Sequence, residues 1–302
     1  MSDTIYLVDA YSQIYRGYYA VPGLATGDGR PSNAIFATGR FLVTLEKEYA
    51  PRAGAFAFDL GAPAHRLALA PAYKAQRPEM PSELKSQLSV IRELIAAAGW
   101  PILDQEGFEA DDIIASIVKT FSGDKFQIIS NDKDLAQVID ERVSMLVQNP
   151  KGGKFSVRGP TEVVEKFGVP TTLIIDYLAM VGDSSDNIPG IDGVGPKTAA
   201  KLLAEFGSIN GILERAAEIK NDSLREKITT AGDLLRKNQQ LITLRSDLTS
   251  AAWNSPDKLR LAPPNLDRLR QIATDYELRS LVKEFETVFS NHASPTQGTF
   301  LL

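Results

Sequence analysis

The sequence predicts an α/β fold in which a mostly parallel sheet, flanked by helices, is followed by a domain of helices alone. Two observations carry this prediction. Short apolar runs alternate with helical patterns up to about residue 160, which is typical of a parallel sheet. Beyond that point the strand pattern fades and only helical spacing continues. We therefore expect a first domain over 1–160, a helical domain over 161–290 and a flexible tail over 291–302.

Four runs in the first half are apolar on both faces, as strands buried within a sheet are. These are residues 4–9, 53–59, 125–130 and 143–148. The spacing of apolar residues between them predicts helices near 33–49, at 82–98 with Ser82 as the N-cap, and at 110–121. Residues 60–81 differ, because four prolines interrupt a stretch too long for an ordinary connection. Loops of this length are often functional.

The composition excludes several kinds of chemistry. The 302 residues contain no Cys and only two His, which excludes thiolate zinc sites, cysteine nucleophiles and histidine-rich metal sites. The N-terminus has no signal-peptide pattern, and no run of about 18 apolar residues exists, so we expect a cytoplasmic protein without a membrane span. The net charge of −5 argues against a simple basic nucleic-acid binder, unless the acids are gathered in one place.

Acidic residues follow three of the predicted strands, and the carboxyl ends of parallel strands share one edge where ligands bind. Two further groups lie at the stretch EADD, which opens a predicted helix, and at a pair of aspartates three residues apart, as on one face of a helical turn. The nine acids are Asp9, Asp59, Glu109, Asp111, Asp112, Asp132, Asp134, Asp183 and Asp186.

If the fold brings these acids together, their repulsion and desolvation would cost several kcal/mol unless divalent cations offset it. Ligands that are all oxygen favour Mg²⁺ or Mn²⁺. Once the nine negative charges are set aside, the net charge changes from −5 to +4, so the remaining surface can still attract a polyanion. The alternative is that each acid serves local structure, since acids are favoured in the first helical turn and at strand ends.

A glycine-rich turn, GVGPKTA, precedes another predicted helix. Gly190, Gly193 and Gly195 allow a tight turn, and the helix that follows offers free N–H groups to an anion. Lys197 and Lys201 add positive charge one turn apart. An ordinary helix–turn–helix connection is the alternative, and the spacing of a P-loop is absent. Basic and aromatic residues elsewhere that suit nucleic acid are Tyr15, Arg16, Tyr19, Arg66, Tyr73, Lys74, Arg77 and Lys133.

The motifs LVDA, YKAQRPEMP, EGFEADDIIAS, SNDKDLAQ and GDSSDNIPGIDGVGPKTAAKLL occur in one order that matches a known family. On these motifs the chain resembles the 5′ nuclease domain of bacterial DNA polymerase I and, more distantly, the flap endonucleases. The resemblance implies a PIN-like α/β domain with an arch insertion near 60–81 and a helical domain with a helix–three-turn–helix. It also implies two metal sites: the first five acids would hold one ion directly or through water, and the last four the other.

The resemblance implies a structure-specific 5′-3′ exonuclease and 5′-flap endonuclease that uses two Mg²⁺ ions, with Mn²⁺ as a substitute, in DNA replication and repair. Lys74 and Arg77 would act on the scissile phosphate, and the helix–three-turn–helix could also hold K⁺. We expect a monomer that binds flapped, nicked or gapped duplex DNA and works with a DNA polymerase. The expected DNA contacts are Arg16, Tyr19, Arg66, Tyr73, Lys133, Gly193, Gly195, Lys197, Thr198 and Lys201.

Two other functions stay open at this stage. A PIN-type ribonuclease shares the sheet and the acidic pocket but needs neither the GVGPKTA turn nor a second helical domain. A structure-specific DNA-binding protein without catalysis is the other possibility. The sequence also leaves open whether the enzyme is free-standing or the front part of a polymerase.

Overall fold

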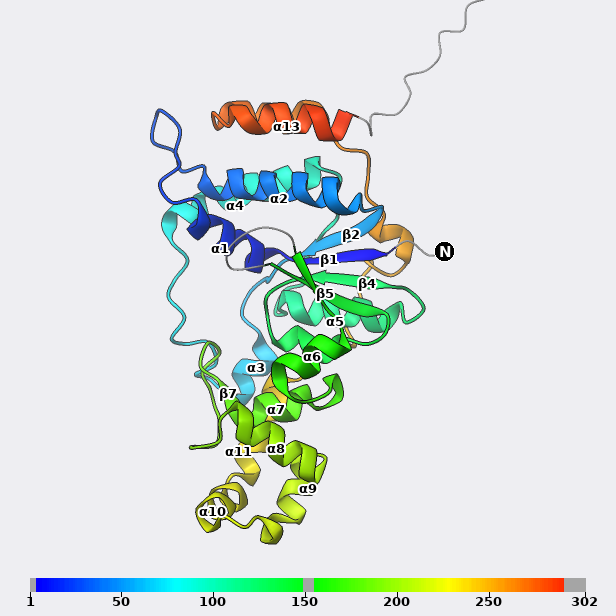
Figure 1. Ribbon diagram of the computed structural model, residues 1–302. Coiled ribbons are helices and arrows are strands. Elements are labelled where there is room, and N and C mark those ends of the chain that lie inside the picture. Colours follow the sequence, from blue (N-terminus) through cyan, green and yellow to red (C-terminus); the bar gives the residue numbers. More distant parts are fainter. Residues whose placement is uncertain (1–3, 149–154, 291–302) are drawn as a thin grey trace, which may run out of the picture.

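The computed structural model describes residues 4–148 and 155–290 (Figure 1). At its centre is a six-stranded sheet in the order β3-β2-β1-β4-β5-β6. The strands are β1 (Ile5–Asp9), β2 (Ala53–Ala57), β3 (Ile102–Leu103), β4 (Phe126–Ile129), β5 (Val143–Gln148) and β6 (Phe155–Arg158). Only β6 is antiparallel to its neighbour, which confirms the predicted α/β fold with a mostly parallel sheet.

The four predicted strands are all present, and β3 and β6 are additional. Strand β1 lies at the centre, between β2 and β4. The chain therefore leaves β1 toward one edge of the sheet and later returns to its other side, which makes the carboxyl end of β1 a topological switch point. Ligand sites in parallel α/β sheets lie at such points.

The side chains of β1 alternate between two hydrophobic cores. Ile5 and Leu7 pack in the core that contains the buried face of α5 (Ala110–Thr120). Tyr6 and Val8 pack on the opposite side of the sheet. That side is covered by α1 (Ala10–Ala20), α2 (Asn33–Tyr49) and α4 (Ser82–Ala97). Figure 1 shows these layers, with α2 and α4 above the sheet and α5 below it.

The predicted helices are present with small changes at their ends. One correction concerns Ser82, which is the first residue of α4 and not its N-cap. Pro81 holds the capping position in an extended conformation, with ψ of 135°, and no side chain caps the helix there. Proline fits a helix start because it has no N–H that would go unpaired.

The last two helices lie on the sheet's upper layer. Helices α12 (Leu266–Asp275) and α13 (Arg279–Phe289) pack against α4 and α2. Gly39 of α2 allows this contact, because a Cβ there would lie 2.6 Å from a methyl group of Leu281. The sequence grouped these helices with the helical domain, and their contacts are with the first half of the chain. The predicted flexible tail over 291–302 lies outside the described residues.

The remaining helices form the lower part of the molecule, in which α9 and α10 lie farthest from the sheet (Figure 1). They are α6 (Pro160–Phe167), α7 (Ile174–Val181), α8 (Pro196–Phe206), α9 (Ile209–Glu214), α10 (Asp222–Thr230) and α11 (Gly232–Ile242). In the part of the chain that the structure describes, no helix combines the length and apolarity that a membrane crossing needs.

A short hairpin follows α7, and it corrects the prediction that Asp183 and Asp186 share a helical turn. Asp183 ends β7 (Gly182–Asp183) and Asp186 lies in the turn that leads to β8 (Ile188–Pro189), where the Asp186 N–H donates to the Asp183 carbonyl at 3.3 Å. Gly182 ends α7 at φ 78°, and a Cβ there would lie 2.3 Å from the Gly190 nitrogen. Glycine fits both this close approach and the positive φ at which the helix ends.

The long insertion contains a short helix, α3 (Ala64–Leu69), followed by turns. Lys74 adopts φ 55°, a left-handed conformation that is uncommon for lysine. Its backbone N–H donates to the carbonyl of Asp186 at 3.0 Å. The insertion is therefore fixed to the β7–β8 hairpin.

Candidate metal centre

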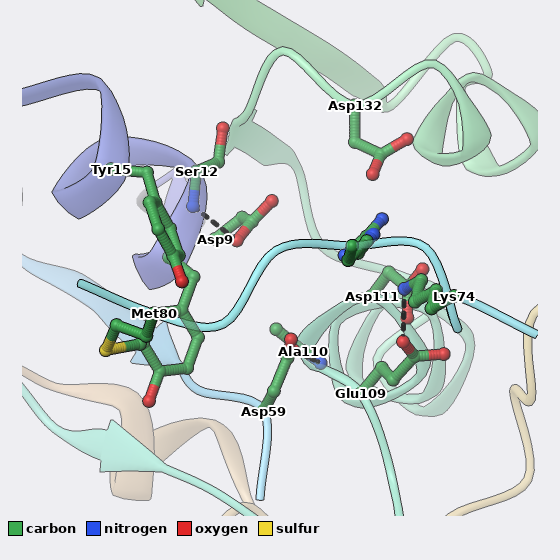
Figure 2. A pocket seen from close by; sticks show the side chains of 12 residues that line it. Asp9, Ser12, Tyr15, Asp59, Lys74, Met80, Glu109, Ala110, Asp111 and Asp132 are labelled. Atoms are coloured by element: carbon green, nitrogen blue, oxygen red, sulfur yellow. Dashed lines mark hydrogen bonds and ion pairs between the residues drawn. The ribbon is translucent and has the colours of Figure 1, made fainter. Parts of the chain in front are cut away.

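A cavity of about 480 Å³ opens at the carboxyl ends of the central strands. Five of the nine predicted acids line it (Figure 2). They come from four segments of the chain: the end of β1, the loop after β2, the start of α5 and the loop after β4. The five are Asp9, Asp59, Glu109, Asp111 and Asp132.

Asp9 has a structural as well as a site-facing role. It ends β1 and caps α1, because its Oδ1 accepts a hydrogen bond from the Ser12 N–H at 3.1 Å. Its Oδ2 accepts from the hydroxyl of Ser130 at 2.8 Å. The Ser130 hydroxyl also accepts from the backbone N–H of Asp132 at 3.0 Å, so it links the carboxylate of Asp9 to the backbone of a second cavity residue. Sequence reasoning did not single out Ser130, although its place directly after β4 was a usable signal.

The stretch EADD serves both of the roles that the sequence left open, which are to start a helix and to supply acids to the site. Glu109 is the N-cap of α5, and a capping box with Asp112 closes the first turn. Asp59 lies two residues beyond the end of β2 and accepts from the N–H of Ala110 at 2.7 Å. The acids therefore begin a helix, and Glu109 and Asp111 also face the cavity.

A second group forms beside the first. Carboxylate oxygens of Asp134, Asp183 and Asp186 lie within 4.8 Å of one another, and all three residues are buried. Asp132 connects the groups, because it lines the cavity while its Oδ1 accepts from the N–H of Asp134 at 2.9 Å. The structure thus brings the nine acids into one region of the fold.

Burial makes the charged form of these carboxylates costly. The pKa of Asp9 is raised to about 7 by burial first and then by the charges of Asp59 and Asp132. Burial is also the main cause of the raised pKa of Asp59, Asp111, Asp132 and Asp134. The pKa of Asp183 is lowered: burial acts to raise it, and the Ser185 hydrogen bonds and Lys133 outweigh that effect. Buried carboxylate oxygens whose like charges repel one another fit a divalent cation.

Basic side chains from the insertion enter this acidic region. The ammonium group of Lys74 contacts Glu109 directly (Figure 2). It also lies 3.6 Å from Asp186. Arg77 donates to Asp186 at 2.6 Å. Lys133, which is outside the insertion and follows Asp132 in the sequence, pairs with Asp183 at 3.1 Å. Predicted catalytic and metal-binding residues therefore lie in direct contact.

Two residues predicted to contact DNA occupy different positions. Arg66 is 1% exposed, and its guanidinium group pairs with Glu109 and Asp112. Tyr73 is 6% exposed, and its hydroxyl donates to Asp186 at 2.9 Å and lies 3.2 Å from Glu109. The prediction of DNA contacts at these two positions is corrected, because both side chains face the carboxylates and neither offers a surface to a base or a phosphate.

Apart from Lys133, which pairs with Asp183, the other predicted DNA contacts lie at two places. Arg16 and Tyr19 are on α1, which starts at the cavity, and Tyr19 is 64% exposed. The remainder belong to the glycine-rich turn and α8, where Gly195 caps the helix and the side chains of Lys197 and Lys201 are exposed. Thr198 follows in the first turn of α8, and Gly193 has φ 78°.

The raised pKa of Asp9 predicts a pH-dependent stability for the chelator-treated protein. Its folded pKa of about 7 exceeds the ordinary value of 3.8, so the protonated carboxyl stabilises the fold below pH 4, and this contribution is lost as the pH rises through 7. We expect the unfolding temperature of Asp9→Asn, relative to that of the wild type, to be several degrees higher at pH 8 than at pH 5. One pKa unit corresponds to roughly 1.4 kcal/mol.

Thermal unfolding of the wild type and the variant at both pH values measures this difference directly. Glu141→Gln, at an exposed carboxylate outside the cavity, should show no such dependence. The same shift at both pH values for Asp9→Asn would contradict the assigned pKa.

Known proteins resemble this chain over nearly its whole length. A family model described as "5'-3' exonuclease, N-terminal resolvase-like domain" matches residues 4–168, and one described as "5'-3' exonuclease, C-terminal SAM fold" matches 169–267. The 5'-3' exonuclease of Aquifex aeolicus is 39% identical over 288 residues, which cover 95% of this chain and 96% of that protein. DNA polymerase I of Mycobacterium bovis is 33% identical over 287 residues, and the match spans 31% of its length.

Solved structures agree in fold. The T5 D15 protein co-crystallized with metal ions has a TM-score of 0.65 at 21% identity, and the match covers 94% of this chain and 99% of that one. The catalytic core of Rad2 in complex with DNA substrate has a TM-score of 0.66 at 17% identity, and the match covers 95% of this chain and 92% of that one. Because the two family models together span most of the sequence and the Aquifex relative matches it almost from end to end, the chain belongs to the 5′-3′ exonuclease family.

Proposed function

We propose that this protein hydrolyses DNA phosphodiester bonds both as a 5′-3′ exonuclease and as a 5′-flap endonuclease, with two divalent cations. The observation that carries the proposal is the convergence of buried carboxylates from distant segments on one cavity, with basic residues of the insertion at its edge. A fold does not normally gather so many acids unless cations offset their repulsion.

The donor set suits Mg²⁺, with Mn²⁺ as a substitute. Asp9, Asp59, Glu109 and Asp111 would hold one ion directly or through water, and Asp132, Asp134, Asp183 and Asp186 the other. Bound ions of this kind lower the pKa of a water molecule and stabilise the leaving oxygen. The chain's own part is to orient these carboxylates in a fixed cavity and to place cations beside the phosphate.

Lys74 and Arg77 are the residues that we assign to the scissile phosphate. Both reach the carboxylates from the insertion, so a phosphate bound between the two acidic groups would lie within their reach. Their positive charge would offset negative charge that develops on the phosphate during cleavage. Cleavage in this arrangement should leave 5′ phosphates on the products.

Duplex DNA would bind at the glycine-rich turn and α8. The exposed backbone of Gly193 and Gly195 leads into the N-terminus of α8, whose free N–H groups suit a phosphate. The carbonyl groups of this turn are also where K⁺ would bind. Arg16 and Tyr19 on α1 would contact DNA nearer the cavity.

Replacing Lys197 with glutamate is expected to weaken duplex binding by roughly tenfold at low salt. It should also reduce the slope of the logarithm of the affinity against the logarithm of the salt concentration by about one. The reason is that an exposed cation at the phosphate-facing end of α8 becomes an anion. Fluorescence anisotropy at several salt concentrations measures both quantities. The matched control is Lys283→Glu, at an exposed position of α13 far from the turn. Equal effects of the two variants would show that the turn is not part of the DNA interface.

The matches to DNA polymerase I support a role in removing primers or flaps during DNA replication and repair. We propose that a DNA polymerase, in the same chain or a separate one, creates the flaps on which this monomeric nuclease acts. The T5 D15 flap endonuclease in complex with DNA and metal ions, which shares this fold, supports the same class of substrate.

The test is cleavage of end-labelled 5′-flap, nicked and single-stranded DNA, with Mg²⁺ and with a chelator. We expect cutting near the flap junction and at the nick, only with the metal. Preferential cleavage of single-stranded RNA would favour a PIN-type ribonuclease instead. Retention of flap DNA without a product under any divalent cation would favour a binding protein.

A further inference from the structure

The guanidinium group of Arg66 lies behind the acidic cavity, where it connects three parts of the fold. Its Nε donates to the carbonyl of Leu241 at the end of α11, at 3.0 Å. Its Nη1 donates to Glu109 at 2.5 Å and to Asp112 at 2.7 Å, and its Nη2 donates to the other oxygen of Asp112 at 2.8 Å. Arg66 itself belongs to α3, at the base of the insertion.

Both carboxylate oxygens of Asp112 are hydrogen-bonded, although one of them lies within 4.8 Å of carboxylate oxygens of Glu109 and Asp111. Its Oδ1 accepts from Arg66 and from the backbone N–H of Arg245 at 2.8 Å, and its Oδ2 accepts from Arg66 and the N–H of Glu109 at 3.4 Å. Two carboxylate oxygens offer about four acceptor positions, and these four bonds use them. Asp112 is 0% exposed and is not among the residues that line the cavity, unlike Asp111.

Glu109 is held so that only one of its oxygens faces the cavity. Its Oε2 accepts from Arg66, and the Tyr73 hydroxyl lies 3.2 Å away on the same side. Its Oε1 contacts Lys74, which lines the cavity. A carboxylate fixed through one oxygen presents the other in a defined direction, which is what a metal ligand requires.

From these contacts we propose that Arg66 and Asp112 are positioning residues, a buried ion pair that aims Glu109 at the metal and ties the base of the insertion to α5. This inference rests on the proposed metal-dependent function. It gives Asp112 a different role from the four other acids of the first group, and it gives Arg66 a role other than DNA contact.

The sign of the change in metal affinity separates positioning from a simple charge effect. Removing a positive charge beside the cavity leaves it more negative, which by itself would tighten the binding of a cation. Losing the bonds that orient a ligand weakens metal binding by 10- to 100-fold in other sites. We expect the second effect to dominate in Arg66→Gln, because the pair is buried and the ligand it holds is in direct contact.

The experiment titrates the DNA-free, full-length protein with Mn²⁺ and counts free Mn²⁺ by electron paramagnetic resonance. Arg66→Gln and Asp112→Asn should still bind two ions, one of them roughly 10- to 100-fold more weakly. Arg66→Lys keeps the charge but loses the paired donors, so it should also bind more weakly. Cleavage by Arg66→Gln should recover at high Mn²⁺. Arg142→Gln, at an ion pair of the sheet's other end, is the control.

Asp111→Asn, in which a cavity-lining acid is changed, distinguishes the two proposals. It should lose one ion; unchanged binding would overturn the proposed metal centre itself. If Asp111→Asn loses an ion while Arg66→Gln binds as tightly as the wild type or more tightly, only the positioning role fails. If Asp112→Asn binds one ion fewer than the wild type, Asp112 is a metal ligand, and the positioning role is likewise overturned.

Some single variants could fail to fold, because each leaves one buried charge without its partner. The double variant Arg66→Met, Asp112→Leu removes both charges together and replaces the ion pair with apolar side chains, a change that folded proteins often tolerate. It carries the same test: two ions bound, one of them more weakly, supports the positioning pair, whereas complete loss of one ion contradicts it.

Discussion

Asp132→Ala is expected to lower the rate of 5′-flap cleavage at saturating Mg²⁺ by roughly a thousandfold or more. Asp132 lines the cavity and also holds the turn that carries Asp134, so its loss disturbs both groups of acids. Electrostatic stabilisation by a bound ion is worth several kcal/mol, and about 1.4 kcal/mol corresponds to a factor of ten in rate. The measurement is a single-turnover assay on an end-labelled flap.

The same variant should leave the fold intact. The pKa of Asp132 is raised by burial and then by the charges of neighbouring acids such as Asp186, so its carboxylate destabilises the metal-free protein at neutral pH. We therefore expect the unfolding temperature of chelator-treated Asp132→Ala to equal or exceed that of the wild type at pH 7. A residue kept for packing would show the opposite result.

Two further measurements complete this test. Glu141→Ala removes an exposed carboxylate nine residues further along the chain and should cut at the wild-type rate. Flap DNA should still bind to Asp132→Ala in a gel shift, because the duplex contacts that we propose lie on α8, away from Asp132. Near-normal cleavage by Asp132→Ala would refute the assignment of the second metal site.

The fold was predictable from the sequence where local chemistry and the global arrangement agree. The buried strands β1, β2, β4 and β5 carry long apolar runs, and three of them are followed by acids that the sheet places at one edge. Strand β3 was not predictable because it has two residues, and the half-exposed β6 is identified only by its pairing with β5.

The acids could be named from their sequence positions, and their individual contacts could not. Asp183 and Asp186 were expected on a helix because of their spacing, and the fold places them in a hairpin because Gly182 ends α7. Arg66 and Tyr73 looked like surface residues of a basic loop. Their burial depends on α5 and the β7–β8 hairpin, and no local pattern reports contacts between segments so far apart.

Lys74→Ala is expected to lower kcat for flap cleavage by about 10²- to 10³-fold and to change KM much less. Removal of one preorganised group that stabilises transition-state charge typically has an effect of this size. Lys74 is preorganised, because its left-handed backbone is held by a hydrogen bond to the Asp186 carbonyl at 3.0 Å. A residue kept in so uncommon a conformation costs about 1–3 kcal/mol, which indicates a site where position matters.

Metal binding separates this role from that of the carboxylates. Lys74 contacts Glu109 in the DNA-free protein, so Lys74→Ala removes a competing cation and should bind Mn²⁺ at least as tightly as the wild type. Loss of cleavage with undiminished metal binding therefore identifies a group that acts on the phosphate. Lys85→Ala, at an exposed position of α4, is the matched control. If saturating DNA restores the full rate to Lys74→Ala, Lys74 only helps to bind the substrate, and the cleavage step depends on the metals and Arg77 alone.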